Sequence, residues 1–98
     1  MRSINPFYRP EKFPRAIHHA KTSIGSATVA VYRDYHQVEL PTNPPYTLIE
    51  ALQRGLRQHH VIQLFNADTG NWDVTIWSQR DRTNTTVTDT VLKLVSAA

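Results

Sequence analysis

Apolar and polar residues alternate most clearly on either side of a turn in the stretch NADTGNWDV, residues 66–74. The letters ADTG fit a type I turn followed by a glycine in the left-handed region, which makes a three-residue hairpin loop with a bulge. If Ala67 pairs with Asn71, one face of the hairpin is apolar and is expected to join the core: Ile62, Leu64, Trp72, Val74 and Ile76. The opposite face then mixes apolar and polar side chains: Val61, Gln63, Phe65, Asp73, Thr75 and Trp77. A shift of the pairing by one residue would scramble both faces.

A second strand-rich segment lies upstream, in SATVAVYRDYHQVEL at residues 26–40. Val29 and Val31 alternate with Ala30 and Tyr32, and β-branched and aromatic residues are typical of strands. The letters RDYH can turn the chain, so we expect a second hairpin whose returning strand covers 37–40. A single long, bent strand is the alternative.

A helix is predicted within residues 41–58, where one side carries apolar residues: Leu48, Ile49, Leu52 and Leu56. Thr47 and Glu50 fit a capping box at its start, and Glu50 and Arg54 have the i,i+4 spacing of a helix ion pair. Gly55 costs roughly 1 kcal/mol inside a helix. Either another element packs closely against this glycine, or the helix ends near it.

A short helix is also predicted nearer the start of the chain, over about 14–22. Its apolar positions recur at intervals of four, three and four residues, which is helical spacing: Phe13, Ile17, Ala20 and Ile24. Pro14 is compatible with this helix if it lies in the first turn.

The last segment, residues 86–98, fits two structures. Four apolar residues follow helical spacing: Val87, Val91, Leu94 and Val95. The threonines of the same segment favour a strand. We expect the helix, over about 86–97 with Thr86 and Asp89 as a weak capping pair, because a hairpin followed by a helix would then occur twice.

Taken in order, these elements predict a small single α+β domain at residues 16–98, preceded by an arm at residues 1–15. A helix would lead into two hairpin-plus-helix units, in the order αββαββα. The expected architecture is a mainly antiparallel sheet of two hairpins with the helices packed on one face.

The composition limits the classes to which the chain can belong. It has 98 residues, of which 40% are hydrophobic and 19% are charged, and this suits one small globular domain. No apolar run is long enough for a membrane span, and the first residues lack the apolar region of a secretory signal. We therefore expect a cytoplasmic protein without a membrane partner. The absence of cysteine excludes disulfides, thiolate catalysis and cysteine-based zinc sites.

Positive charge is concentrated at the start of the chain. Residues 1–22 contain five bases and one acid, a net charge of +4, whereas residues 23–98 contain six bases and seven acids, a net charge of −1. Three prolines favour extended backbone in the arm. The arm also interleaves basic and aromatic side chains, as proteins that bind single-stranded nucleic acid do. Its candidate binding residues are Arg2, Tyr8, Arg9, Lys12 and Arg15.

The sequence carries no motif for catalysis or metal binding. The histidine pairs at 18–19 and 59–60 consist of neighbours whose side chains diverge on a helix or a strand, and His36 stands alone. Asp68 is expected to bond the backbone of the turn. We therefore expect no enzymatic activity, no cofactor and no metal. A pocket that joins a histidine to a carboxylate would be the feature that speaks for an enzyme.

The expected function is that of a small, non-enzymatic binding module that contacts another protein or a second copy of itself. The mixed face of the hairpin offers more apolar surface than a solvated face needs, and exposed aromatics beside polar residues suit an interface. The candidate interface residues are Val61, Phe65, Asp73, Thr75 and Trp77. A nucleic-acid binder that uses the arm is the alternative. The size and build are common among small accessory or regulatory proteins of bacteria and phages, but they indicate no particular family.

Overall fold

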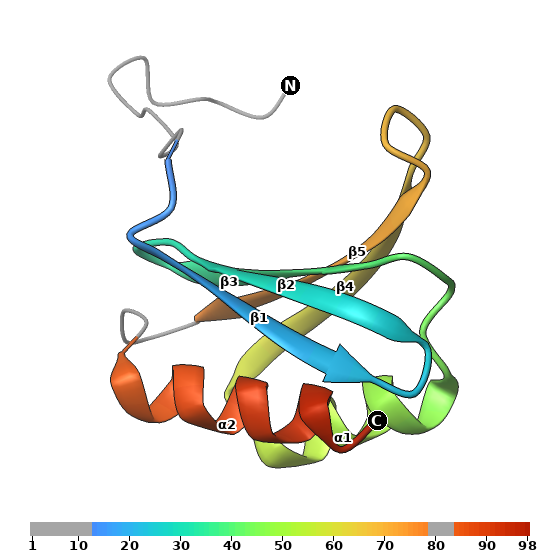
Figure 1. The fold of residues 1–98 in the computed structure, drawn as a ribbon. Coiled ribbons are helices and arrows are strands. Elements are labelled where there is room, and N and C mark those ends of the chain that lie inside the picture. Colours follow the sequence, from blue (N-terminus) through green and yellow to red (C-terminus); the bar gives the residue numbers. More distant parts are fainter. Residues whose placement is uncertain (1–12, 79–83) are drawn as a thin grey trace, which may run out of the picture.

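The computed structural model describes residues 13–78 and 84–98, which form a five-stranded antiparallel sheet with two helices on one face (Figure 1). The elements follow the order βββαββα: β1 (Ala16–Thr22), β2 (Gly25–Val31), β3 (Tyr35–Leu40), α1 (Tyr46–Gly55), β4 (His59–Asn66), β5 (Asn71–Ser78) and α2 (Thr85–Ser96). The strands lie in the order β1-β2-β3-β5-β4, so β1 and β4 are the two edges. The predicted α+β class, with an antiparallel sheet and helices on one face, is confirmed.

The first element is the strand β1 rather than the helix predicted over 14–22, so the predicted order αββαββα is wrong at its first position. A tight turn pairs β1 with β2, with Thr22 opposite Gly25. Thr22 Oγ1 accepts a hydrogen bond from Ile24 N–H (3.1 Å) and donates one to the Gly25 carbonyl (2.7 Å). Gly25 has φ of 121°, and a Cβ there would lie 2.7 Å from Pro41 Cγ, so the position requires glycine. Because this turn commits the segment to a hairpin, the helical spacing of its apolar residues is coincidental.

The hairpin predicted from residues 26–40 is confirmed, and the alternative of one bent strand is excluded. β2 and β3 pair in antiparallel fashion, with Val29 opposite Val38, and both of these side chains are buried. At the turn, Tyr32 N–H donates to the Tyr35 carbonyl at 2.9 Å.

The β4–β5 hairpin turns where it was predicted to turn, but its strands pair one residue away from the predicted register. Asn66, rather than Ala67, lies opposite Asn71. This shift turns β4 over relative to β5. Two of the predicted core residues are therefore exposed on the opposite face: Ile62 and Leu64. Two others are buried as predicted: Val74 and Ile76.

The side chain of Asn66 explains the longer loop. Its Oδ1 accepts hydrogen bonds from the N–H groups of Asp68 (3.0 Å) and Thr69 (3.3 Å), and its carbonyl accepts one from Gly70 N–H (2.8 Å). Gly70 adopts the predicted left-handed conformation, with φ of 76°. The backbone-bonding role predicted for Asp68 is therefore performed by Asn66, and the loop contains four residues, 67–70, instead of three.

The helix predicted within 41–58 is confirmed as α1, but its start is not the predicted capping box. The N-cap position is Pro45, and no side chain caps the helix there, so the predicted roles of Thr47 and Glu50 in capping are wrong. The predicted ion pair is present, with 3.2 Å between Arg54 Nη2 and Glu50 Oε1. Gly55 is the last residue of α1, and a Cβ on it would lie 2.8 Å from a methyl carbon of α2, so both explanations offered for this glycine hold.

The helix expected over 86–97 is confirmed as α2, and the strand alternative is excluded. Its cap is Asn84, whose Oδ1 accepts from Val87 N–H at 3.0 Å, and not the predicted pair of Thr86 and Asp89. An Asn at this position satisfies an N–H group that the helix itself leaves without a partner.

The core lies between the sheet and the two helices. From the sheet it takes Ala20, Ala27, Val29, Val38, Leu40, Val74 and Ile76. From the helices it takes Leu48, Ile49, Leu52, Leu56, Val91 and Val95. Both helices cover the same face, so within the described part of the chain the opposite face of the sheet carries no helix (Figure 1).

Candidate functional site

The face of the sheet opposite α1 and α2, here named the helix-free face, displays every second residue of each strand. The strand registers arrange these residues in rows that run across the sheet. One row holds Tyr35, Trp77 and His60. The next row holds Ile17, Ala30, Gln37, Thr75 and Ile62, and the third holds His19, Thr28, Glu39, Asp73 and Leu64.

Three aromatic rings line the end of the helix-free face near the β2–β3 turn. The rings of Tyr32 and Tyr35 are stacked, with centroids 4.5 Å apart and an interplanar angle of 11°. The Tyr35 and Trp77 centroids are also 4.5 Å apart, with an angle of 34°. All three residues are half-buried. Because each ring packs against its neighbour, the row is held as a stiff apolar surface.

Aliphatic side chains extend this aromatic row along β4. Ile62 is 44% exposed and Leu64 is 64% exposed, and both share the face of Trp77. Ile62 is a diagonal neighbour of Trp77 across the strand pair, a distance that an aromatic side chain spans. We name the resulting surface the sheet-face patch and define it as Tyr32, Tyr35, Ile62, Leu64 and Trp77.

Two carboxylates border the sheet-face patch. Glu39 on β3 and Asp73 on β5 are directly opposite each other, an arrangement in which like charges destabilise a sheet. Asp73 Oδ2 accepts a hydrogen bond from Asn66 Nδ2 at 3.4 Å. Its Oδ1 is buried and has no hydrogen-bond partner among the residues that the structure describes.

The structure divides the five predicted interface residues between the two faces of the sheet. Asp73, Thr75 and Trp77 lie together on the helix-free face. Val61 lies on the helix side, where it packs against the core. Phe65 shares that side, is 53% exposed, and contacts Trp72 with ring centroids 5.3 Å apart.

Four members of the sheet-face patch were not predicted as interface residues: Tyr32, Tyr35, Ile62 and Leu64. The sequence predicts Ile62 and Leu64 in the core because a three-residue loop, one residue shorter than the observed loop, would turn β4 over. Tyr35 belongs to the letters RDYH, which predict a turn, although it begins β3. The sequence signal for Ile62 and Leu64 is Asn66, because an Asn whose side chain accepts from the N–H groups two and three residues later is typical of the start of a turn.

Four of the five predicted nucleic-acid-binding residues lie outside the described residues: Arg2, Tyr8, Arg9 and Lys12. The fifth, Arg15, is exposed, and its N–H donates to the Val31 carbonyl at 2.7 Å just before β1 begins. Phe13, which leads into this residue, is 80% exposed.

The fold brings His36 into the core, where it is fully buried under α2. Its Nε2 lies 2.7 Å from Thr88 Oγ1, and the Thr88 hydroxyl also donates to the Asn84 carbonyl at 3.1 Å. Since that hydroxyl has one proton, both bonds require that His36 donates from Nε2, which leaves Nδ1 as an acceptor. Nδ1 is buried without a partner in the described part of the chain. Desolvation, together with the nearby His59 and His18, lowers the pKa of His36 from 6.5 to about 4.

His36 and Thr88 have the spacing of a general base and a hydroxyl nucleophile, but three features favour a structural role. No carboxylate orients Nδ1, because that atom has no partner among the described residues. A histidine whose pKa is about 4 is a weak base near neutral pH. Thr88 is only 8% exposed, and its hydroxyl already accepts one hydrogen bond and donates another.

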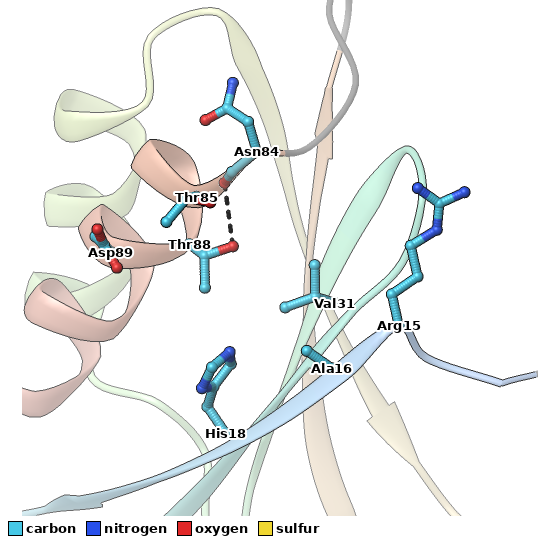
Figure 2. Close-up of a pocket in the computed structure, with 8 residues that line it drawn as sticks. All are labelled: Arg15, Ala16, His18, Val31, Asn84, Thr85, Thr88 and Asp89. Atoms are coloured by element: carbon cyan, nitrogen blue, oxygen red, sulfur yellow. Dashed lines mark hydrogen bonds between the residues drawn. The ribbon is translucent and has the colours of Figure 1, made fainter.

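A pocket of about 350 Å³ lies between the start of α2 and the strands β1 and β2 (Figure 2). It is lined by Arg15, Ala16, His18, Val31, Asn84, Thr85, Thr88 and Asp89. The pocket thus contains the combination of a histidine and a carboxylate that would speak for an enzyme. No hydrogen bond or ion pair joins His18 to Asp89 in the described structure, however, and Figure 2 draws one bond among the lining residues, from Thr88 to Asn84.

Within residues 13–78 and 84–98, no three His, Asp or Glu side chains are grouped closely enough to hold a metal ion. No helix of that same part is long and apolar enough to cross a membrane. Comparison of the chain with protein-family models, with curated proteins and with solved structures gives no match.

Proposed function

We propose that the chain is a non-enzymatic protein-binding module whose contact surface is the sheet-face patch. The observation that supports this proposal is an antiparallel sheet with helices on one face and half-exposed aromatic and aliphatic side chains gathered on the other. Interface centres are rich in aromatic residues and poor in charge, and a contiguous apolar surface on a small domain marks an interaction site.

The border of the patch favours a protein over a nucleic acid. Glu39 and Asp73 lie on the same face and would repel phosphates, while Lys21 is the one Lys or Arg among the strand residues of this face. The aromatic rings also stack on one another, which leaves less of each ring free for a base. A protein segment with apolar side chains and a Lys or Arg aimed at the two carboxylates fits this surface.

Leu64→Lys tests the proposal, because it places a charge on the patch at an exposed position. The probe is a random peptide library displayed on phage and selected on the intact wild-type chain. Selected peptides should lose at least about tenfold in affinity for Leu64→Lys, as expected for the centre of an interface. Tyr46→Lys is the matched control, because Tyr46 is 73% exposed at the start of α1, in the layer of helices rather than on the patch.

Unfolding curves separate a lost contact from a lost fold. Because Leu64 is 64% exposed, Leu64→Lys should change the unfolding free energy by no more than about 0.5 kcal/mol. Peptides that bind Leu64→Lys as well as they bind the wild type, or that are equally sensitive to Tyr46→Lys, would show that the patch is not the contact surface.

A nucleic-acid binder that uses the arm is the second candidate. The observation in its favour is that Phe13 and Arg15, an aromatic and a basic residue at the end of the arm, are both exposed ahead of β1. Fluorescence anisotropy with a labelled single-stranded oligonucleotide tests it. The affinity should fall steeply with salt and disappear when residues 1–15 are deleted. Binding to a protein should depend weakly on salt and survive that deletion. The cytoplasmic location expected from the sequence stays a prediction.

A further inference from the structure

The strand β4 forms one edge of the sheet, and its backbone directions follow from two hydrogen bonds. His59 lies opposite Ser78, and Ser78 N–H donates to the Asp34 carbonyl on the far side of β5 at 2.9 Å. His59 N–H donates to the Leu56 carbonyl at 2.9 Å, also away from β5. His59 and Ser78 therefore form a non-hydrogen-bonded pair. The direction in which the backbone N–H and C=O groups point alternates from one residue of β4 to the next. The N–H and C=O groups of Val61, Gln63 and Phe65 consequently point out of the sheet.

This edge lacks the features that usually prevent strands from pairing. β4 is eight residues long, HHVIQLFN, and contains no Lys, Arg, Asp, Glu or Pro. Edges are normally protected by charges, prolines, bulges or a covering segment, and a long apolar edge is a template for another strand. The opposite edge, β1, carries Lys21. In the described part of the chain, no further strand pairs with β4.

The sequence of β4 matches itself in an antiparallel arrangement centred on Gln63. In that register Ile62 faces Leu64 of a second copy on the helix-free face, and Val61 faces the second copy's Phe65 on the helix side. Gln63 faces itself at the two-fold axis. Every apolar residue of the pair thus meets an apolar residue, which is the condition for a stable cross-strand contact. The outward backbone groups of Val61, Gln63 and Phe65 meet as hydrogen-bonded pairs.

We infer that a second copy of this chain is the partner of β4, and that the two sheets join edge to edge into one ten-stranded sheet. A two-fold axis perpendicular to the sheet keeps the helices of both copies on the same side. The Gln63 side chain is held by its own chain, because its Nε2 donates to Asn43 Oδ1 at 2.7 Å. The two sheet-face patches become continuous through Ile62 and Leu64 of each copy. The inference concerns an edge rather than a face, so it goes beyond the proposed function.

Single cysteines test the pairing and its register, because the chain has no cysteine of its own. Residues of a hydrogen-bonded antiparallel pair have Cα atoms about 5.5 Å apart, which suits a disulfide. Gln63→Cys should therefore form a covalent dimer rapidly under mild oxidation. Val61→Cys should not, because the two copies of residue 61 lie roughly 14 Å apart along the strands. Gln53→Cys, on the exposed side of α1, reports the rate of random collisions.

Sedimentation of unmodified protein over a concentration series provides the second measurement. One strand pair buries less area than a standard interface, so the wild type should dimerise weakly, with a dissociation constant on the order of micromolar. Gln63→Lys places two like charges at the axis and should raise that constant at least about tenfold. Thr75→Lys, one strand inward on the helix-free face, should leave it unchanged. The inference would be overturned if Gln63→Cys crosslinks no faster than Gln53→Cys, or if Ile62→Cys crosslinks faster than Gln63→Cys. Leu64→Lys should weaken the dimer as well, because Leu64 faces Ile62 of the second copy. Peptide binding to Gln63→Lys therefore separates the two proposals: Gln63 lies on the helix side, outside the sheet-face patch, and this variant should bind the selected peptides as the wild type does.

Discussion

Acid should destabilise this protein through His36 before most carboxylates are protonated. The side chain is fully buried, and its pKa is lowered from 6.5 to about 4. The unfolded chain therefore takes up a proton near pH 6.5, whereas the folded chain resists it until about pH 4. The contribution of neutral His36 to stability is complete above pH 6.5 and is lost progressively as the pH falls towards 4.

The magnitude follows from the separation of the two pKa values. Each pH unit between them is worth about 1.4 kcal/mol, so a separation of about 2.5 corresponds to a loss of about 3 kcal/mol. A domain of this size has a total stability of roughly 5–15 kcal/mol. The loss is therefore a large share of the whole, and the urea midpoint should fall clearly between pH 7 and pH 4.

Urea unfolding followed by tryptophan fluorescence at several pH values measures this effect, and His36→Leu isolates it. Leucine cannot titrate. The drop in the free energy of unfolding between pH 6.5 and pH 4 should therefore be smaller in this variant than in the wild type by about 3 kcal/mol. His60→Gln is the control, because it removes an exposed histidine of the helix-free face and should keep the wild-type dependence. Parallel curves for the wild type and His36→Leu would refute the reasoning, whatever the absolute stability of the variant.

Five further substitutions at four positions test the local structure by the same unfolding measurement. Asn84→Ala removes the cap of α2 and should cost about 1 kcal/mol, whereas Asn84→Asp should be nearly neutral. Gly70→Ala introduces strain alone, about 1 kcal/mol, because no atom lies within 4 Å of the new Cβ, whereas Gly25→Ala adds a clash with Pro41 and should cost more. Thr88→Val leaves the Nε2 proton of His36 unsatisfied and should cost about 1–3 kcal/mol, and much of that cost should vanish in the His36→Leu background. If the costs of Thr88→Val and His36→Leu simply add in the double variant, the assigned hydrogen bond is contradicted.

The sequence predicted the elements whose local signals agree. In β5, polar and apolar residues alternate cleanly, and Val74 and Ile76 were correctly placed inside with Trp77 outside. In α2, the helical stripe outweighed the threonines, because the apolar face packs against the sheet and an Asn caps its start. The β2–β3 hairpin was predicted on the same kind of agreement between alternating residues and a turn.

The failures arose where the local signal was ambiguous or depended on a distant contact. The spacing of Ile17 and Ala20 fits a helix, but pairing with β2 through the Gly25 turn overrides it. The burial of His36 and its bond to Thr88, 52 residues away, depend on how α2 lies over the sheet. The approach of His18 and His59 to His36 depends on strand order, which residue patterns do not specify.

The composition of β4 explains why a single loop residue decides which surface the protein exposes. Apart from Gln63, its central residues, VIQLF, are apolar on both faces, so either orientation of the strand would bury apolar side chains against the helices. The orientation is fixed by the four-residue loop that Asn66 holds together, and at the other end by the bond from His59 N–H to Leu56. With Val61 and Phe65 turned to the helix side, Ile62 and Leu64 remain outside next to Trp77. β4 also contains no Lys, Arg, Asp or Glu, so this edge of the sheet carries none of these charged side chains. The sheet-face patch and the edge proposed for dimerisation therefore have one origin, a strand that is apolar on both faces and is oriented by its flanking turns.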